Sequence, residues 1–143
     1  MENESNSFNQ SQSELKQRIV LILTGSFNPV TIGHLHTLQF SRDYYQARSI
    51  QVLEGILSPV SDSYGKPGLI NAKYRIEMLQ AATRDEPWLR VDTWEAEQPT
   101  WTKTKLVLDH HHDLVKKKYG DDVGLRLLSG LLKIDFINQK QTR

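Results

Sequence analysis

The sequence predicts an α/β domain built on a parallel sheet. Short apolar runs alternate with longer stretches in which apolar residues recur at helical spacing, and no segment repeats another. The first apolar run, "RIVLIL", is continuous, which is typical of a strand that is buried on both faces. Strands that alternate with helices imply crossover connections, and these are right-handed in nearly all parallel sheets. We therefore expect a layered fold in which helices flank the sheet.

The expected elements follow in chain order. The first strand covers residues 18–23 and stops before Gly25, and the first helix covers residues 32–45 with Thr31 as its cap. The turn-forming stretch "SDSYGKPG" separates the second strand from the second helix. The remaining elements are a strand at 49–57, a helix at 70–83, a strand at 88–94, a helix at 101–119 and a strand at 124–130.

The composition indicates an ordinary globular protein. The chain has 143 residues, which suits one domain with a hydrophobic core, and 38% of them are hydrophobic and 24% charged. A net charge of +1 argues against a dedicated nucleic-acid binder, and the absence of cysteine leaves no disulfide framework and no thiolate metal site. No apolar run approaches the roughly 18 residues of a membrane span. We expect neither a nucleic acid nor a membrane as partner.

Polarity suggests where the domain begins. Residues 1–17 are polar and lack the basic start and apolar core of a secretory signal, so we expect a disordered tail there. Residues 18–130 hold all of the expected elements, and residues 131–143 follow as a C-terminal tail.

The stretch "TGSFNPVTIGHL" joins the first strand to the first helix. Ligands of parallel sheets bind beyond the carboxyl ends of the strands, where helices point free N–H groups outward. Gly25 lets the backbone approach a ligand, Ser26 adds a hydroxyl, and His34 lies within about one turn of the helix start. The stretch is neither a P-loop nor a three-glycine dinucleotide fingerprint. Turn chemistry alone leaves two interpretations open: a phosphate site, or an ordinary strand-to-helix turn with a surface histidine.

Several blocks of the sequence resemble a known enzyme family. In order along the chain, they are "GSFNPVTIGHL", "GILSPVSDSYGKPGLINAKYRIEML", "VDTWEAEQPTWTKTKLVLDHHHDL" and "LRLLSG". They are similar to blocks of the eukaryotic-type nicotinamide mononucleotide (NMN) adenylyltransferases, in the nucleotidyltransferase superfamily. The first block is typical of the whole superfamily, whereas the Ser-Pro-Val-x-Asp-x-Tyr and Val-Asp-x-Trp-Glu blocks are specific to the family. The resemblance implies a Rossmann-like fold and the reaction of NMN, or nicotinate mononucleotide, with ATP to give NAD and pyrophosphate, assisted by Mg²⁺.

The resemblance also implies roles for the matching residues. His34 would be the catalytic residue and contact the ATP phosphates, and Lys66 would be a phosphate cation beside the mononucleotide. Trp101 would stack on the nicotinamide ring and Thr104 would hydrogen-bond near it; three residues apart on a helix, they would share a face. The other nucleotide contacts would be Gly25, Ser26, Phe27, Tyr64, Gly65 and Gly130.

Ordinary structural roles compete with these assignments. Lys66 could be a solvated loop residue, and Trp101 could be a core residue at a helix start. The histidines at 110–112 invite a metal site, but consecutive helical residues point in different directions. We expect an amphipathic helix surface at these histidines and no metal ligands.

The sequence departs from the family pattern after Gly130. The family continues there with Ala-Asp, whereas this chain has Leu131 and Leu132 and so lacks the nucleotide-binding carboxylate. The family's second half-sheet and its Ser-x-x-x-Arg-Arg type element have no counterpart before Arg143, and residues 131–143 resemble no family block. We therefore expect a truncated product with the second half of the sheet missing. Such a product should expose an apolar edge, tend to self-associate, and form NAD far more slowly than a complete member, or not measurably.

Three functions stay open at this point. The first is NMN adenylyltransferase, with ATP, NMN and NAD as its ligands. The second is a catalytically impaired isoform that binds a mononucleotide or associates with another copy or a full-length protein. The third is a different nucleotidyltransferase, against which Trp101 and Thr104 argue. Because no targeting segment is legible, we expect an intracellular protein, in the nucleus or cytoplasm rather than the mitochondrion.

Overall fold

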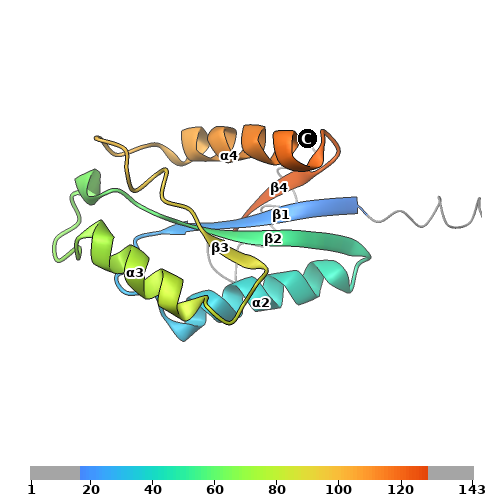
Figure 1. Cartoon of the computed structure of the whole chain (residues 1–143), viewed down its shortest axis with the longest axis horizontal. Coiled ribbons are helices and arrows are strands. Elements are labelled where there is room, and N and C mark those ends of the chain that lie inside the picture. Colours follow the sequence, from blue (N-terminus) through green and yellow to red (C-terminus); the bar gives the residue numbers. More distant parts are fainter. Residues whose placement is uncertain (1–16, 129–143) are drawn as a thin grey trace, which may run out of the picture.

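The computed structural model describes residues 17–128, which form a four-stranded parallel sheet with helices on both faces (Figure 1). The strands are β1 Gln17–Gly25, β2 Ile50–Pro59, β3 Leu89–Val91 and β4 Gly124–Leu128, in the sheet order β3-β2-β1-β4. The helices are α2 Ile32–Gln46, α3 Ala72–Ala82 and α4 Thr104–Tyr119, with a 3₁₀ turn, η1, at Asp62–Tyr64. The predicted α/β fold with a parallel sheet is confirmed.

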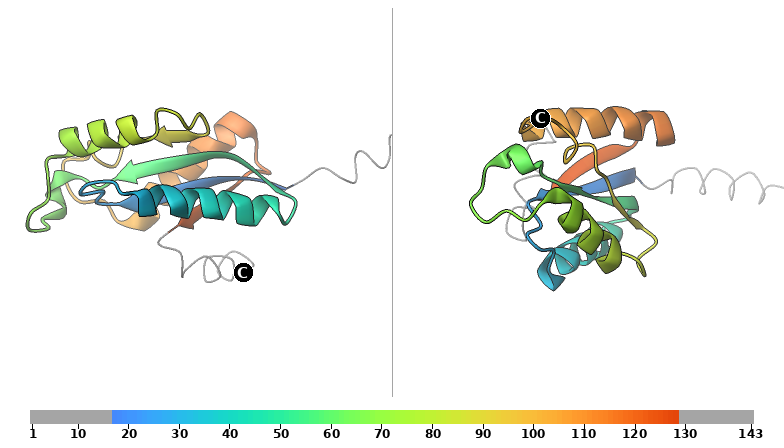
Figure 2. Two further views of the ribbon diagram at one scale, coloured as in Figure 1. Left: turned by 90° about the horizontal axis from the view of Figure 1, so that it is seen from below. Right: turned by 60° about the vertical axis from the view of Figure 1, so that its left-hand side comes forward.

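Two hydrophobic clusters hold the layers together. Helices α2 and α3 cover one face of the sheet and α4 covers the other (Figure 2). Leu21, Leu38 and Leu79 belong to the cluster on the α2 and α3 side, and Ile22 and Val107 belong to the cluster under α4. β1 therefore supplies both clusters with alternate residues, as its continuous apolar run predicts. Within residues 17–128, the helices are too short and too polar to cross a membrane.

The direction in which the chain winds reverses next to β1. From β1 the chain moves outward through β2 to β3, and α4 then carries it back to the other side of β1, where β4 pairs. In open α/β sheets, ligands bind at the carboxyl edge near such a reversal. Because the strands are parallel, their carboxyl ends share one edge of the sheet, which lies on the left in Figure 1.

Two of the predicted element boundaries are wrong. β3 ends at Val91 rather than at 94, since the Asp92 carboxylate accepts the backbone N–H of Trp94 at 3.0 Å and the chain turns away from the sheet. α4 begins at Thr104 rather than at 101, so Trp101 lies in the segment before the helix. The other elements lie where the sequence predicts them, with shifts of one or two residues at their ends, and the predicted end of the last strand at 130 lies outside the described residues.

The predicted tails lie largely outside the described residues. Gln17, the last residue of the expected N-terminal tail, already belongs to β1. Residues 1–16, Gly130 and the expected C-terminal tail at 131–143 are outside the described part of the chain.

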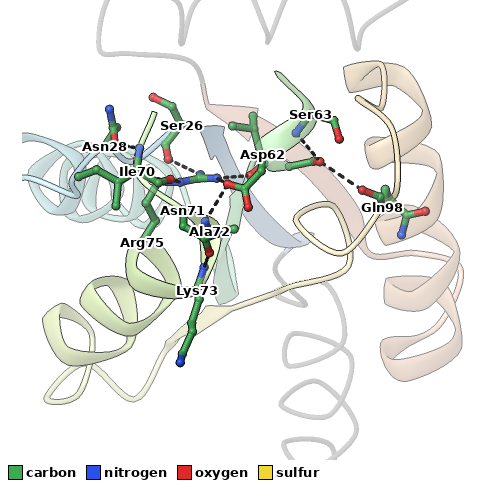
Figure 3. Close-up of polar contacts among 12 residues, drawn as sticks. Ser26, Asn28, Asp62, Ser63, Ile70, Asn71, Ala72, Lys73, Arg75 and Gln98 are labelled. Atoms are coloured by element: carbon green, nitrogen blue, oxygen red, sulfur yellow. Dashed lines mark hydrogen bonds and ion pairs between the residues drawn. The ribbon is translucent and has the colours of Figure 1, made fainter. Parts of the chain in front are cut away.

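The side chain of Arg75 joins the loops that follow β1 and β2 (Figure 3). Arg75 lies on α3 and is completely buried. Its guanidinium donates to the carbonyl oxygens of Ser26 at 2.7 Å, Val60 at 2.9 Å and Ile70 at 2.6 Å. It also forms an ion pair of 3.1 Å with Asp62. The planar, five-donor guanidinium suits such multiple contacts, and it fixes the two loops to one another.

Two further side chains strengthen this junction. The Asn28 side chain donates to the carbonyl oxygen of Gly68 at 3.0 Å and accepts the backbone N–H of Ile70 at 2.8 Å. The Asp62 carboxylate accepts the backbone N–H of Ala72 at 2.8 Å, at the first residue of α3. The start of α3 and the loop before it are therefore held against the end of β1.

Replacing Arg75 with methionine should lower the free energy of unfolding by about 3–5 kcal/mol, because three partly or fully buried carbonyl oxygens would lose their donor. Urea denaturation followed by circular dichroism measures this loss. The control is Lys73→Met, which changes an exposed lysine on the same helix and should alter the free energy by less than about 0.5 kcal/mol. Equal stabilities of the two variants would show that the Arg75 contacts do not stabilise the fold.

Candidate functional site

Three segments meet at the carboxyl edge of the sheet: residues 25–31, which start at the last residue of β1, 60–71 after β2 and 92–103 after β3. Figure 2, right, brings this edge toward the viewer. Within the described part of the chain, every predicted site residue lies in one of these segments or in the first turn of the next helix. Gly130, predicted as a nucleotide contact after β4, lies outside the described residues.

His34 is the third residue of α2, and its ring reaches back to the cap of the helix. Thr31 occupies the predicted cap position and donates its backbone N–H to His34 Nδ1 at 2.9 Å. Because Nδ1 accepts this hydrogen bond, the proton of the neutral imidazole is on Nε2. Burial lowers the pKa of His34, which favours the neutral ring at pH 7. The Nε2–H group is therefore the donor that the ring keeps for a ligand.

Phe27 can contribute only its backbone to a ligand site. Its side chain is buried, with the ring centroid 5.0 Å from that of His34 in an edge-to-face arrangement. Its φ of 47° is uncommon for a residue with a bulky side chain and costs on the order of 1–3 kcal/mol. The buried ring and the Arg75 bond to the preceding carbonyl, that of Ser26, hold this conformation in place.

Gly25 is not required by the packing of the protein. A Cβ at this position would lie 3.7 Å from the Phe27 ring, which is an ordinary contact, and Gly25 is not among the glycines with positive φ. Packing among the described residues therefore does not explain why this position is a glycine.

Tyr64 and Trp101 form an exposed aromatic pair. Their ring centroids are 6.3 Å apart, with planes inclined by 35°, and the residues are 46% and 48% exposed. The alternative interpretation of Trp101 as a helix-start core residue is therefore wrong. Half-exposed rings of this size offer a flat surface on which a planar ligand can stack.

Lys66 follows Tyr64 by two residues, and Thr104 follows Trp101 by three. Thr104 is the exposed first residue of α4, and because Trp101 precedes the helix, the expectation that the two share a helix face is wrong. Lys66 follows Gly65, whose φ of 73° ends the η1 turn in a left-handed conformation that glycine adopts without steric cost. Lys66 is exposed, and its side-chain ammonium group makes no ion pair or hydrogen bond with the described residues, so its charge is available to an anion.

Three serine hydroxyls tie the segment that carries Trp101 to β2 and the loop after it. They donate across the edge, one to a carboxylate and two to backbone carbonyls. The pairs, with the serine first, are Ser58 with Glu95 at 2.6 Å, Ser61 with Gln98 at 3.2 Å and Ser63 with Pro99 at 3.0 Å. These contacts hold the Tyr64 and Trp101 segments side by side.

Sequence reasoning missed Arg75, Asn28 and Glu95, which position the site. Arg75 carried a detectable signal, because it shares the buried stripe of α3 with Ala72 and Leu79, where an apolar residue is expected. Asn28 and Glu95 lie within the blocks that resemble the family, but no local pattern indicated their roles, since their partners are distant in the sequence and a polar residue in a turn is ordinary.

The histidines of α4 have separate environments. The His110 ring stacks on Trp94, with centroids 3.9 Å apart and planes within 10°. His111 is completely buried, with Nε2 3.6 Å from the Asp92 carboxylate, so the expectation of a surface is wrong for this residue. Burial lowers the pKa of His111, which favours its neutral form. Among residues 17–128, no group of three histidine, cysteine or acidic side chains is arranged to hold a metal ion.

Comparison with known proteins places this geometry in a family. The family model for cytidylyltransferase-like proteins matches residues 22–137. Nicotinamide/nicotinic acid mononucleotide adenylyltransferase 2 of Caenorhabditis elegans is 49% identical over 115 residues, which cover 80% of this chain and 52% of the relative. Its namesake from Danio rerio is 46% identical over 106 residues, which cover 73% of this chain and 35% of the relative. Nicotinamide/nicotinic acid mononucleotide adenylyltransferase 1 of Bos taurus is 42% identical over 107 residues, which cover 74% and 38%.

The alignments cover most of this chain but only part of each relative. The chain spans about half the length of the Caenorhabditis elegans relative and little more than a third of the other two. The family model, in contrast, covers most of the chain and nearly all of the described elements. The chain belongs to the cytidylyltransferase-like family, and within it the chain resembles the nicotinamide/nicotinic acid mononucleotide adenylyltransferases.

Proposed function

We propose that this site binds NMN or nicotinate mononucleotide and takes part in its adenylylation by ATP, which yields the dinucleotide and pyrophosphate. The observation that carries the proposal is the exposed Tyr64–Trp101 pair, with the free charge of Lys66 in the same loop as Tyr64. The names of the relatives, which state this activity for those proteins, support the same assignment.

The aromatic pair and its neighbours suit the mononucleotide. The nicotinamide ring of NMN is planar and positively charged, and tryptophan is the side chain that attracts such a ring most strongly. Trp101 would stack on the ring, and the Thr104 hydroxyl would hydrogen-bond near it. Lys66 would pair with the phosphate as a point charge, while Tyr64 and Gly65 would line the same side.

The end of β1 and the start of α2 suit the phosphates of ATP. Gly25, Ser26 and Phe27 would hold them through backbone groups, and the absence of a Cβ at Gly25 leaves space for this approach. The Nε2–H of His34 would donate to a phosphate oxygen at the N-terminus of α2, where the helix dipole favours negative charge. Gly130 would add a contact after β4.

The proposed reaction is a direct displacement. A phosphate oxygen of the mononucleotide attacks the α-phosphorus of ATP and forms a new P–O bond. The bond to pyrophosphate breaks, and pyrophosphate leaves with the electron pair. ATP is taken as its Mg²⁺ complex, in which the ion is bound mainly through the phosphates. No protein nucleophile is needed, so the chain acts by positioning the substrates and by donating hydrogen bonds to the charge on the phosphates.

The second candidate is a mononucleotide-binding protein that does not complete the reaction or that associates with another copy or a longer relative. The observation that favours it is that the exposed aromatic pair and the charge of Lys66, which carry the proposal, belong to the mononucleotide side of the site. Both candidates share the mononucleotide site. Formation of NAD from NMN and Mg²⁺-ATP by the purified chain distinguishes them.

Replacing Trp101 with alanine should weaken NMN binding by about tenfold or more, because stacking of a base-like ring on an aromatic side chain contributes roughly 1–3 kcal/mol. Isothermal titration calorimetry with millimolar NMN measures the change. Tyr74→Ala removes another exposed aromatic ring, which lies on α3 outside the pair, and should leave binding unaltered. The proposed site is wrong if folded wild-type protein gives no heat with NMN, or if the Trp101 variant binds as the wild type does.

His34 should matter for the chemical step. In a chimera that joins residues 1–130 to the later part of the Caenorhabditis elegans relative, we expect His34→Ala to slow NAD formation by about 10²–10³, the usual effect of losing one donor to developing charge. The loss of the capping hydrogen bond should lower stability by only about 1 kcal/mol. His36→Ala, an exposed histidine on the same helix, is the matched control and should retain the full rate. An active chimera that is indifferent to His34 would remove this residue from the site.

A further inference from the structure

Side-chain contacts of two kinds attach the segment 92–103, which carries Trp101, to β2 and the following loop, in addition to the backbone hydrogen bond of 2.9 Å from Asp92 to the Leu57 carbonyl. The hydroxyls of Ser61 and Ser63 donate to backbone carbonyls, which do not titrate. The hydroxyl of Ser58 donates instead to the carboxyl group of Glu95, so the third contact depends on the state of an acid.

The carboxyl group of Glu95 is enclosed by the protein. Glu95 is 4% exposed, and its Oε2 accepts the hydroxyl of the completely buried Ser58 at 2.6 Å. Ser58 lies on the face of β2 that α4 covers, since Ile56, two residues earlier, belongs to the cluster under α4. Among residues 17–128 no cation pairs with Glu95, and one neutral hydroxyl compensates a buried negative charge poorly. The enclosed position therefore suits the neutral carboxylic acid better than the carboxylate.

We propose that Glu95 is a positioning residue of the mononucleotide site, which holds the Trp101 segment against β2 while it is protonated and loosens it on ionisation. The mononucleotide as ligand rests on the proposed function. The attachment of residues 92–103 to β2 is independent of that function, because it follows from contacts within the chain.

The direction of the pH effect follows from the two environments of the carboxyl group. Burial raises the pKa of Glu95 to about 7 from its ordinary value of 4.5, although the Ser58 hydrogen bond works against the rise. In a detached segment the carboxyl group meets water and regains its ordinary pKa. The attached form binds more protons than the detached form between these two values, so attachment weakens as the pH rises through this interval. With these two pKa values, the equilibrium constant for attachment of the segment is about 30-fold smaller at pH 8.0 than at pH 5.5.

Other titratable groups near the segment have different partners. The segment itself contains Asp92, Glu97 and Lys103. The neighbouring elements contribute Arg90 from β3, Glu54 from β2, and His110 and His111 from α4. Arg90 pairs with the carboxylates of Glu54 and Asp92. None of the groups bonds to Glu95 within the described residues. A variant that changes Glu95 alone keeps all of these groups in place, which makes such a variant the appropriate reference.

Amide hydrogen exchange of residues 92–103 tests the attachment without a ligand. After correction for the intrinsic exchange rate, we expect about 30-fold less protection at pH 8.0 than at pH 5.5 in the wild type. Glu95→Gln keeps an oxygen that accepts the Ser58 hydroxyl but cannot ionise, so its protection should be equal at both pH values. Glu97→Gln, which changes an exposed acid two residues away, should behave as the wild type does. The same pH dependence in the wild type and in Glu95→Gln would overturn the proposal.

Calorimetric titration with NMN at the same two pH values separates this proposal from the proposed function. The phosphate of NMN and His34 titrate equally in both proteins, so the ratio of wild-type to Glu95→Gln affinity isolates Glu95, and we expect it to fall by up to about 30-fold as the pH rises. If NMN binds neither protein while the exchange difference holds, the proposed ligand is wrong and the positioning role of Glu95 stands. If NMN binds both proteins with the same pH dependence and the exchange profiles coincide, the role of Glu95 is wrong and the proposed function stands.

Discussion

The buried guanidinium of Arg75 is the constraint on which the candidate site depends. A charged group in the interior is tolerated only when its donors find acceptors, and here the acceptors are three carbonyl oxygens from the loops after β1 and β2, together with the Asp62 carboxylate. The end of β1 and the loop after β2 must therefore lie on either side of one side chain of α3. Their separation is set by the shape of a planar group, which varies less than the shape of a packed apolar cluster. The uncommon backbone of Phe27 is maintained next to this junction.

The other parts of the site are arranged outward from this junction. Because Arg75 fixes the loop after β2, the serines of β2 and that loop can in turn hold the segment after β3, and this brings Trp101 beside Tyr64. The resulting edge favours anions. The free charge of Lys66, the neutral donor ring of His34 and the N-termini of α2 and α4 all lie at it. Asp62, the acid of η1, is neutralised by its ion pair with Arg75. A negatively charged ligand with a planar ring suits both the electrostatics and the aromatic pair.

The sequence predicted the layers better than it predicted the supports of the site. Periodicity and continuous apolar runs report burial directly, so the order of elements and the two-sided burial of β1 followed from them. Thr31 as a helix cap followed from local chemistry. The start of α4 did not, because a helical pattern does not distinguish Trp101 in an extended segment from Trp101 in a first turn. The burial of His111 and Glu95, and the contacts of Asn28, depend on partners far along the chain, which no local pattern encodes.

The central claim is that the three segments at the carboxyl edge form one site, in which residues 64–66 and 101–104 bind the mononucleotide and residues 25–28 bind the phosphates of the adenylyl donor. The most direct measurement is a titration of the isotope-labelled protein with NAD, the proposed product that would occupy both parts, followed by the backbone amide resonances in two-dimensional NMR spectra. The account predicts saturable shifts in all three segments, at residues 25–28, 64–66 and 101–104, that fit one dissociation constant. Shifts that are confined to a single segment, or that map instead to the outer surfaces of α2 and α3, would contradict it.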